Sequence, residues 1–188
     1  MTGEKRTIEV DARTLRAIAH PLRMRMLGLL RLEGPATATS LAARLGESSG
    51  TTSWHLRQLA EYGFIEEDTE QGNRRDRWWR AVHQFTRVRS ENFLDDPSDA
   101  GALATFLFEA LAIYYRNATN FVAQLQSWGR EWVEAADVSD RQLSLKAPEL
   151  AELRKELRDV IARYDREPEP DDAAVCVQLQ LFPRSGPL

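Results

Sequence analysis

A change in the spacing of apolar residues at Gly63 most constrains the fold of this chain. Across residues 11–62, apolar side chains recur every three or four residues, which is the spacing of amphipathic helices. Residues 64–69 and 77–82 instead hold β-favouring side chains on either side of the turn-forming residues 70–73. We therefore expect several short helices followed by a two-stranded hairpin.

The helical part carries start and stop signals that divide it into four helices. Side chains that cap a helix or suit its first turn mark the starts, and glycines that tolerate a positive φ mark the ends. The expected starts are Asp11, Pro21, Thr39 and Ser48, and the expected ends are Ala19, Gly34, Gly46 and Gly63. Helices in this order, closed by a hairpin, form a winged helix-turn-helix.

Three segments of this region resemble the arsenic-repressor (ArsR) family of bacterial regulators. They read LRAIAHPLRMRML at residues 15–27, SLAARLG at 40–46 and SWHLRQLAEYGFI at 53–65. The resemblance covers about residues 11–85. It implies a bacterial, DNA-binding transcription regulator with a winged helix-turn-helix.

The chain departs from the metal-sensing members of that family at two familiar sites. Where a Cys-x-Cys pair would precede the third helix it has Thr37-Ala38-Thr39, and its one cysteine is Cys176. A second layout, an Asp/His/His/Glu cluster after the wing, needs two histidines beyond His83, and none occurs. We therefore expect a non-metal-sensing relative that needs no metal and no other cofactor.

Charge is divided unevenly along the chain. The formal net charge of −4 would argue against a nucleic-acid binder, but residues 1–90 carry +4 and residues 91–188 carry −8. Four arginines of the first half fall within residues 74–80, at or near the expected tip of the hairpin. The acidic total therefore says nothing against a basic DNA-binding face.

The fourth helix, residues 48–62, is the candidate for the DNA major groove, and the hairpin, residues 64–82, for the minor groove or backbone. Small hydroxyl residues allow close approach at the helix start, and Arg57 can donate two hydrogen bonds to guanine. The candidate DNA-binding residues are Thr39, Ser48, Ser49, Gly50, Thr51, Ser53, Trp54, Arg57, Arg74, Arg75 and Arg77. Two alternatives stay open: Ser48 as a simple helix cap, and Trp54 packed against the wing.

Residues 95–99 form a break that divides the chain into a winged domain, residues 1–94, and a second domain, residues 95–188. In the second domain, apolar residues from Leu103 to Trp132 form a stripe with a mean spacing of 3.6 residues, which fits one helix. That helix would be about 50 Å long and too apolar for one small domain to cover. We therefore expect it to pair two copies of the chain into a homodimer.

The remainder of the second domain predicts a small strand–helix–strand unit. Residues 142–145 and 175–181 fit short strands, and Pro148 opens a helix between them. An apolar pocket for a small-molecule effector is an alternative to a plain dimer core. Its expected lining is Phe106, Glu109, Tyr114, Arg116, Phe121 and Trp128.

The expected fold class is therefore mainly α with a small β-hairpin wing. The N-terminus has no apolar signal segment, and the most apolar stretch, residues 101–115, is too short to span a bilayer, so we expect a cytoplasmic protein. No catalytic motif occurs, and the three histidines offer no nucleophile–base pair, so we expect no enzyme. The alternative to a DNA-binding homodimer is a winged-helix module that binds a protein partner.

Overall fold

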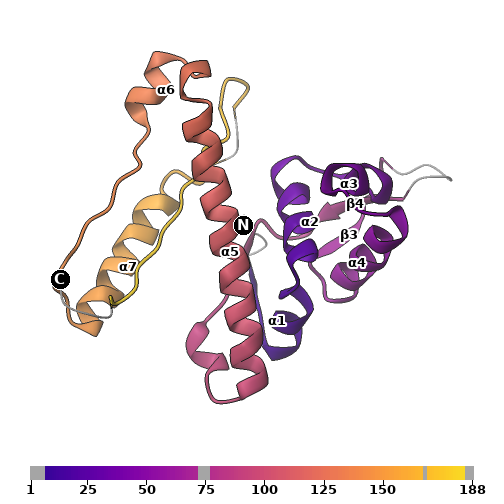
Figure 1. Ribbon diagram of the computed structural model, residues 1–188, viewed down its shortest axis with the longest axis horizontal. Coiled ribbons are helices and arrows are strands. Elements are labelled where there is room, and N and C mark those ends of the chain that lie inside the picture. The colour runs from indigo at the N-terminus through magenta and orange to yellow at the C-terminus, as the bar shows by residue number, and fades with distance from the viewer. Residues whose placement is uncertain (1–6, 72–76, 167–168, 185–188) are drawn as a thin grey trace. The chain divides into compact units, whose positions relative to one another are not determined.

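The computed structural model describes residues 7–71, 77–166 and 169–184. The chain divides into two compact units, Met1–Tyr115 and Arg116–Leu188, and helix α5 (Pro97–Ala123) runs through the boundary. Figure 1 labels the helices α1 to α7 and the strands β3 and β4. The predicted division of the chain after residue 94 stays a prediction.

The first unit alternates short helices and short strands in the order expected of a winged helix-turn-helix. Its elements are β1 (Thr7–Glu9), α1 (Ala12–Ile18), α2 (Pro21–Leu32), β2 (Ala36–Thr37), α3 (Ala38–Leu45), α4 (Ser49–Glu61), β3 (Ile65–Glu67), β4 (Trp78–Ala81), β5 (Phe85–Arg87), a 3₁₀ helix (Ser90–Phe93) and the start of α5. The predicted fold class, mainly helical with a small hairpin, is confirmed.

Most of the predicted helix ends are confirmed by their capping contacts. Asp11 caps α1 by accepting a hydrogen bond from the Thr14 N–H at 2.8 Å, and Pro21 is in the first turn of α2. Gly46 ends α3 with a φ of 71°, a conformation that glycine adopts without steric cost. The prediction of Thr39 as the cap of α3 is wrong, because Thr37 forms a reciprocal capping box with Ser40.

The wing is a three-stranded antiparallel sheet in the order β2-β4-β3. The expected hairpin of β3 and β4 pairs Ile65 with Ala81 and Glu67 with Trp79. Strand β2 adds a pair between Ala36 and Trp79, and a separate parallel pair joins β1 to β5. These two pairings were not predicted, because strands of two or three residues are too short for apolar alternation to be recognised.

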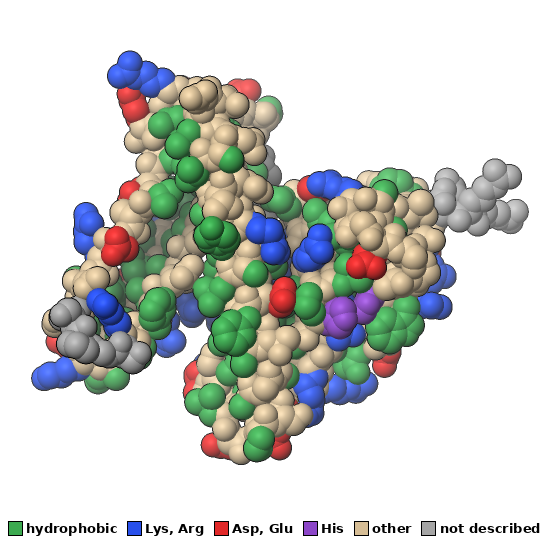
Figure 2. Space-filling model, in the orientation of Figure 1, with side chains coloured by type: hydrophobic (Ala, Val, Ile, Leu, Met, Phe, Trp, Pro, Cys, Tyr) green, Lys and Arg blue, Asp and Glu red, His purple; other side chains and the backbone are tan. Residues whose placement is uncertain are grey.

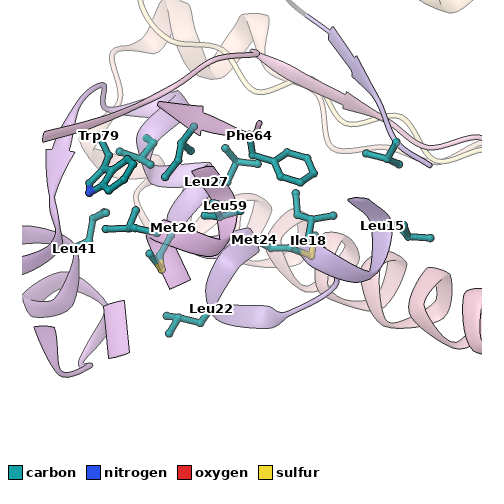
Figure 3. Packing of buried hydrophobic residues seen from close by; sticks show 14 of the residues in the cluster. Leu15, Ile18, Leu22, Met24, Met26, Leu27, Leu41, Leu59, Phe64 and Trp79 are labelled. Carbon is teal, nitrogen blue, oxygen red and sulfur yellow. The ribbon is translucent and has the colours of Figure 1, made fainter. Parts of the chain in front are cut away.

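The core of the first unit gathers side chains from every helix around the wing (Figure 3). The largest side chains that are completely buried are Phe64, Leu15, Ile18, Met26, Leu27, Leu41, Leu56, Leu59 and Ile65. Trp79 of β4 is buried with them and its neighbour Trp78 is half-buried, as expected from their alternation along a strand. Removal of this apolar surface from water is the main stabilising contribution to the domain.

The first half of α5 packs onto this core through one row of side chains. Leu103 is buried, and Phe106, Ala110 and Ile113 pack against the core cluster. The Arg16 guanidinium of α1 also lies 2.9 Å from the Asp99 carboxylate. These residues make the contact between α5 and the core, while other apolar residues of this half of α5 remain exposed.

The half-buried side chain of Arg31 links α2 to the segment that follows β4. The Arg31 side chain donates to the carbonyl oxygen of His83 at 2.7 Å and to the Thr86 hydroxyl at 2.9 Å. Its burial lowers the pKa of Arg31 to about 10, which leaves the guanidinium charged at neutral pH. The two hydrogen bonds satisfy part of the charge that burial removes from water.

The second unit is simpler than predicted. It contains the end of α5, a 3₁₀ helix (Leu125–Ser127), α6 (Arg130–Ala135) and α7 (Ala147–Ala162). The expected single helix through Trp132 is therefore wrong, because α5 stops at Ala123 and α6 restarts after Gly129. The apolar spacing persists across that break, so periodicity alone could not find it.

The strands expected at residues 142–145 and 175–181 do not form. Both segments have apolar residues at alternating positions, but neither makes a ladder of backbone hydrogen bonds within the described residues. The helix expected from Pro148 is confirmed as α7, where Glu149 accepts a hydrogen bond from the Lys146 N–H at 2.6 Å. The strand–helix–strand unit is thus a helix flanked by extended chain.

Candidate nucleic-acid interface

The turn between α3 and α4 fixes the direction in which α4 begins. After Gly46 the chain reaches Ser48, whose Oγ accepts a hydrogen bond from the Thr51 N–H at 3.1 Å. The Thr52 hydroxyl donates to the Ser48 carbonyl oxygen at 3.0 Å, and Thr52 is fully buried. The expected cap at Ser48 is confirmed, and these two hydrogen bonds stabilise the first turn of α4.

The two faces of α4 differ in burial: one packs on the core and the other is open to solvent. Its buried face consists of Thr52, His55, Leu56 and Leu59. On the opposite side Gly50, Trp54 and Arg57 are exposed, and they are flanked by the exposed Ser49 and Thr51 and the half-buried Ser53. The candidate residues of this helix therefore form one surface on the side away from the core.

The start of α4 is electrostatically suited to an anion. The helix has no acidic residue in its first turn, and the nearest carboxylate before it is that of Glu47, one residue before the cap. The first turn of α3 has no acidic residue either, and it exposes Thr39. Among the described residues, no protein group accepts a hydrogen bond from the Ser49 or Gly50 N–H. Such amides commonly bind phosphate.

Trp54 and Arg57 are the large side chains of this surface. Trp54 is half exposed (50%), and its ring packs edge-on against the His55 ring at a centroid distance of 4.7 Å. Arg57 is exposed and takes part in no ion pair among the described residues. Its guanidinium is therefore available for a ligand without the loss of an internal contact.

The wing presents arginines that already have partners. The Arg77 guanidinium lies 3.1 Å from the Glu67 carboxylate and over the Trp79 ring at 5.6 Å. Arg80 pairs with Glu66 at 2.8 Å. Exposed ion pairs of this kind contribute little to stability, so both arginines can exchange their glutamate for a phosphate. Arg80, which was not among the candidates, lies on the same hairpin as Arg77.

The candidates Arg74 and Arg75 lie outside the described residues.

Of the residues expected to line an effector pocket, Phe106, Glu109 and Tyr114 are half-buried positions of α5 in the first unit. The other three belong to the second unit, where Arg116 and Trp128 are exposed and Phe121 stacks on Trp128 at 6.5 Å.

Two histidines that no sequence motif links, His20 and His55, contact each other on the core side of α4. His20, which precedes α2, lies with its ring 4.4 Å from that of His55 in α4. Thirty-five positions separate them in the sequence. His55 is buried, and its Nδ1 has no hydrogen-bond partner in the described part of the chain.

The described residues contain no group of three or more histidine, cysteine, aspartate or glutamate side chains placed to hold a metal ion. No helix within the same residues is both long enough and apolar enough to cross a membrane.

Residues 18–68 match a family described as a helix-turn-helix domain. No protein of curated function matches the chain. Solved structures similar to it include one described as a possible transcriptional regulator for arsenical resistance, with 26% identity over 61% of this chain and 96% of that one, at a TM-score of 0.33. Another is a transcriptional regulator from Thermotoga maritima, with 15% identity over 82% of this chain and 86% of that one, at 0.33.

A third is a mutant of ZitR from Lactococcus lactis, with 14% identity over 81% of this chain and 75% of that one, at a TM-score of 0.30. The family match covers α2, α3, α4 and β3, which are the elements that form the candidate surface and its support. The predicted resemblance to a helix-turn-helix domain is thereby confirmed. Residues 18–68 match the helix-turn-helix domain family, and together with the β3–β4 hairpin they form a winged helix-turn-helix.

Proposed function

We propose that the chain is a sequence-specific DNA-binding transcriptional regulator that acts as a homodimer. The observation that carries the proposal is the surface of α4 opposite the core: it begins with small residues and unpaired amides and continues with Trp54 and Arg57. A helix of this kind fits the major groove of DNA. The role is one of binding without catalysis, in the cytoplasm.

In the proposed complex the start of α4 approaches the sugar–phosphate backbone and Arg57 contacts base edges. Ser48, Ser49, Gly50 and Thr51 would lie against phosphate, because they are small and the helix dipole favours an anion there. Arg57 is placed two turns further along and would donate two hydrogen bonds to guanine. Ser53 and Trp54 would lie at the edge of this contact, and Thr39 on the first turn of α3 would contact phosphate.

The wing would contact the minor groove or the backbone through Arg74, Arg75 and Arg77. Arginine is favoured in a narrow minor groove because the electrostatic potential there is strongly negative. Binding would require Arg77 to exchange Glu67 for phosphate. That exchange costs little, because both side chains of the pair are about half exposed (58% and 45%).

The homodimer is proposed from the apolar side chains that α5 leaves in water. Leu107, Phe108, Leu111 and Tyr115 are 41%, 72%, 44% and 73% exposed, on the part of the helix that belongs to the first unit. Hydrophobic side chains gather along α5 in Figure 2. A second copy that covers them would place two winged domains for adjacent DNA half-sites, about 10 base pairs apart or a multiple of this. A variant of the proposal adds an apolar small-molecule effector that binds the second domain, residues 95–188.

The alternative function is a winged-helix module that binds a protein. One observation favours it: in the described part of the hairpin Arg77 and Arg80 are each paired with a glutamate, and Asp68 and Glu70 add negative charge, so the hairpin is acidic there. An acidic hairpin suits a protein surface better than it suits DNA. The two functions differ in their dependence on salt, because only phosphate contacts release condensed counterions.

Selection of bound sequences from a random duplex pool tests the proposal. The full chain should enrich a two-fold symmetric site, and its affinity for that site should fall steeply with salt. Arg57→Ala should relax the preferred base at one position in each half-site, whereas Arg158→Ala removes the same charge from α7 and should change nothing. A pool that shows no enrichment, with salt-insensitive binding, would favour the protein-binding alternative.

A further inference from the structure

The winged domain holds a pair of histidines that the proposed DNA contact does not use. His55 lies on the inner side of α4 and is only 6% exposed, and His20 is half-buried just before α2. Their ring centroids are 4.4 Å apart with planes at 43°. In Figure 2 histidine side chains lie together beside hydrophobic and basic side chains. The pair thus joins the start of α2 to the candidate recognition helix.

The hydrogen bond that His20 accepts and the burial of His55 both favour neutral imidazole rings. His20 caps α2, because its Nδ1 accepts a hydrogen bond from the Leu22 N–H at 3.2 Å. An imidazolium carries a proton on both nitrogens, so a protonated His20 cannot accept this bond. The Nδ1 of His55 is buried without a hydrogen-bond partner among the described residues. Protonation of His55 would leave a buried N–H donor there with no acceptor.

The charges around the pair come from three segments of the chain. Arg23 of α2 faces both rings, as does Glu47 of the turn before α4, and Glu109 of α5 faces His20. Burial lowers the pKa of His20, and Arg23 lowers it further, against the opposing effect of Glu109 and Glu47. Burial likewise lowers the pKa of His55, followed by His20 and Arg23, and Glu47 opposes them. The folded domain therefore favours two neutral rings.

A displacement of the His55 ring would be transmitted to the candidate DNA surface through Trp54. Trp54 is the neighbour of His55 in α4, and their rings are in edge contact at 4.7 Å. Trp54 is half exposed on the side where Arg57 and the free amides lie. A shift of His55 away from His20 and Arg23 would move Trp54 and the turn of α4 that bears it.

We propose that the His20–His55 pair makes DNA binding sensitive to pH: protonation of the pair on mild acidification uncaps α2, displaces α4 and releases the DNA. The proposal rests on the proposed function, since it concerns the helix that would contact DNA. Protons would regulate that contact by binding to both rings.

The sign of the effect on stability follows from the direction of both shifts. A histidine whose pKa is lower in the folded state than in the unfolded chain binds fewer protons when folded. Its contribution to stability is therefore complete above the unfolded value of about 6.5 and is lost as the pH falls toward the folded value. Acid should thus loosen this domain through the same two rings that are proposed to release DNA.

The test compares the wild-type chain with His20→Asn/His55→Gln. Asparagine keeps a side-chain acceptor at the start of α2, and neither new residue titrates. Wild-type affinity for the selected duplex should fall at least about tenfold more than that of the double variant between about pH 7.5 and about pH 5.5. His83→Gln, which changes the third histidine of the chain, should retain the wild-type pH dependence.

Histidine ring resonances of the wild-type chain give a second measurement that needs neither DNA nor a variant. Two of the three rings should titrate below the unperturbed value of about 6.5. Equal pH dependence of DNA affinity in wild type and double variant, or titration of His20 and His55 at or above that value, would overturn the proposal. A chain that binds no DNA at about pH 7.5 would contradict the proposed function instead, and the ring titration would still decide whether the pair resists protonation.

Discussion

Replacement of Gly50 by alanine should separate DNA binding from folding. Gly50 is the second residue of α4 and is exposed, and its φ does not require glycine. A Cβ built there would meet only the Ser48 Oγ, at 3.9 Å, which is an ordinary contact. The folded domain therefore has room for the methyl group.

The size of both effects can be worked out from this geometry. Alanine in a helix is more stable than glycine by up to about 1 kcal/mol, and a gain of some tenths is expected in a first turn. Against DNA, the new methyl group would occupy the space through which we expect the backbone to approach. Loss of one close contact of that kind costs about 1–3 kcal/mol, or about five- to 150-fold in affinity.

The assay pairs thermal unfolding with fluorescence anisotropy on the selected duplex. Gly28→Ala is the matched control, because Gly28 is an exposed glycine of α2 with nothing within 4 Å of its built Cβ. Both variants should melt at or above the wild-type temperature, and only Gly50→Ala should lose affinity. If Gly50→Ala bound DNA as tightly as Gly28→Ala, DNA would not approach the start of α4, and the proposed docking would be refuted.

Three further predictions follow from contacts already described. Arg57→Ala should leave the melting temperature unchanged, because the side chain is exposed, and should weaken discrimination at one base pair by about 1–3 kcal/mol, measured by competition with substituted duplexes. Glu67→Gln should release Arg77 and raise DNA affinity with a steeper salt dependence, whereas a weaker affinity would show that the pair itself binds DNA. Leu103→Ala should destabilise the first unit by about 2–5 kcal/mol in denaturant unfolding, since Leu103 is buried where α5 meets the core; a loss below about 0.5 kcal/mol would contradict that packing.

The N-terminal fold could be predicted from sequence because its signals are local. Asp11 and Ser48 cap helices through hydrogen bonds to residues three positions away, and Gly46 supplies the positive φ that ends α3. The cap of α3 was misplaced by two residues, since Thr37 and Thr39 are both good capping residues by type. The choice between them depends on Ser40, which completes the capping box with Thr37 only.

The C-terminal fold could not be predicted with the same success. Apolar spacing continues from Leu103 past the end of α5, so it gave no sign of the interruption before Gly129. Alternation in residues 175–181 met the criteria for a strand, but a strand also needs a hydrogen-bonded neighbour, and alternation does not supply one. Tertiary pairing decides both outcomes.

The candidate site was predictable in part for the same reason. The candidate DNA-binding residues between Ser48 and Arg57 lie on one helix, so the surface that they share follows from helical spacing. The approach of His20 to His55 depends instead on the packing of α2 against α4, which no spacing within either helix encodes. The engagement of Arg77 by Glu67 likewise depends on the register of β3 and β4.

Methylation interference on the selected duplex tests the central claim most directly, because it reports which groove α4 occupies. Guanine N7 lies in the major groove and adenine N3 in the minor groove. The account predicts that N7 methylation of particular guanines in each half-site blocks binding of the wild-type chain, and that Arg57→Ala removes this sensitivity at one of them. Full binding to duplexes methylated at every guanine N7 would contradict the insertion of α4 into the major groove.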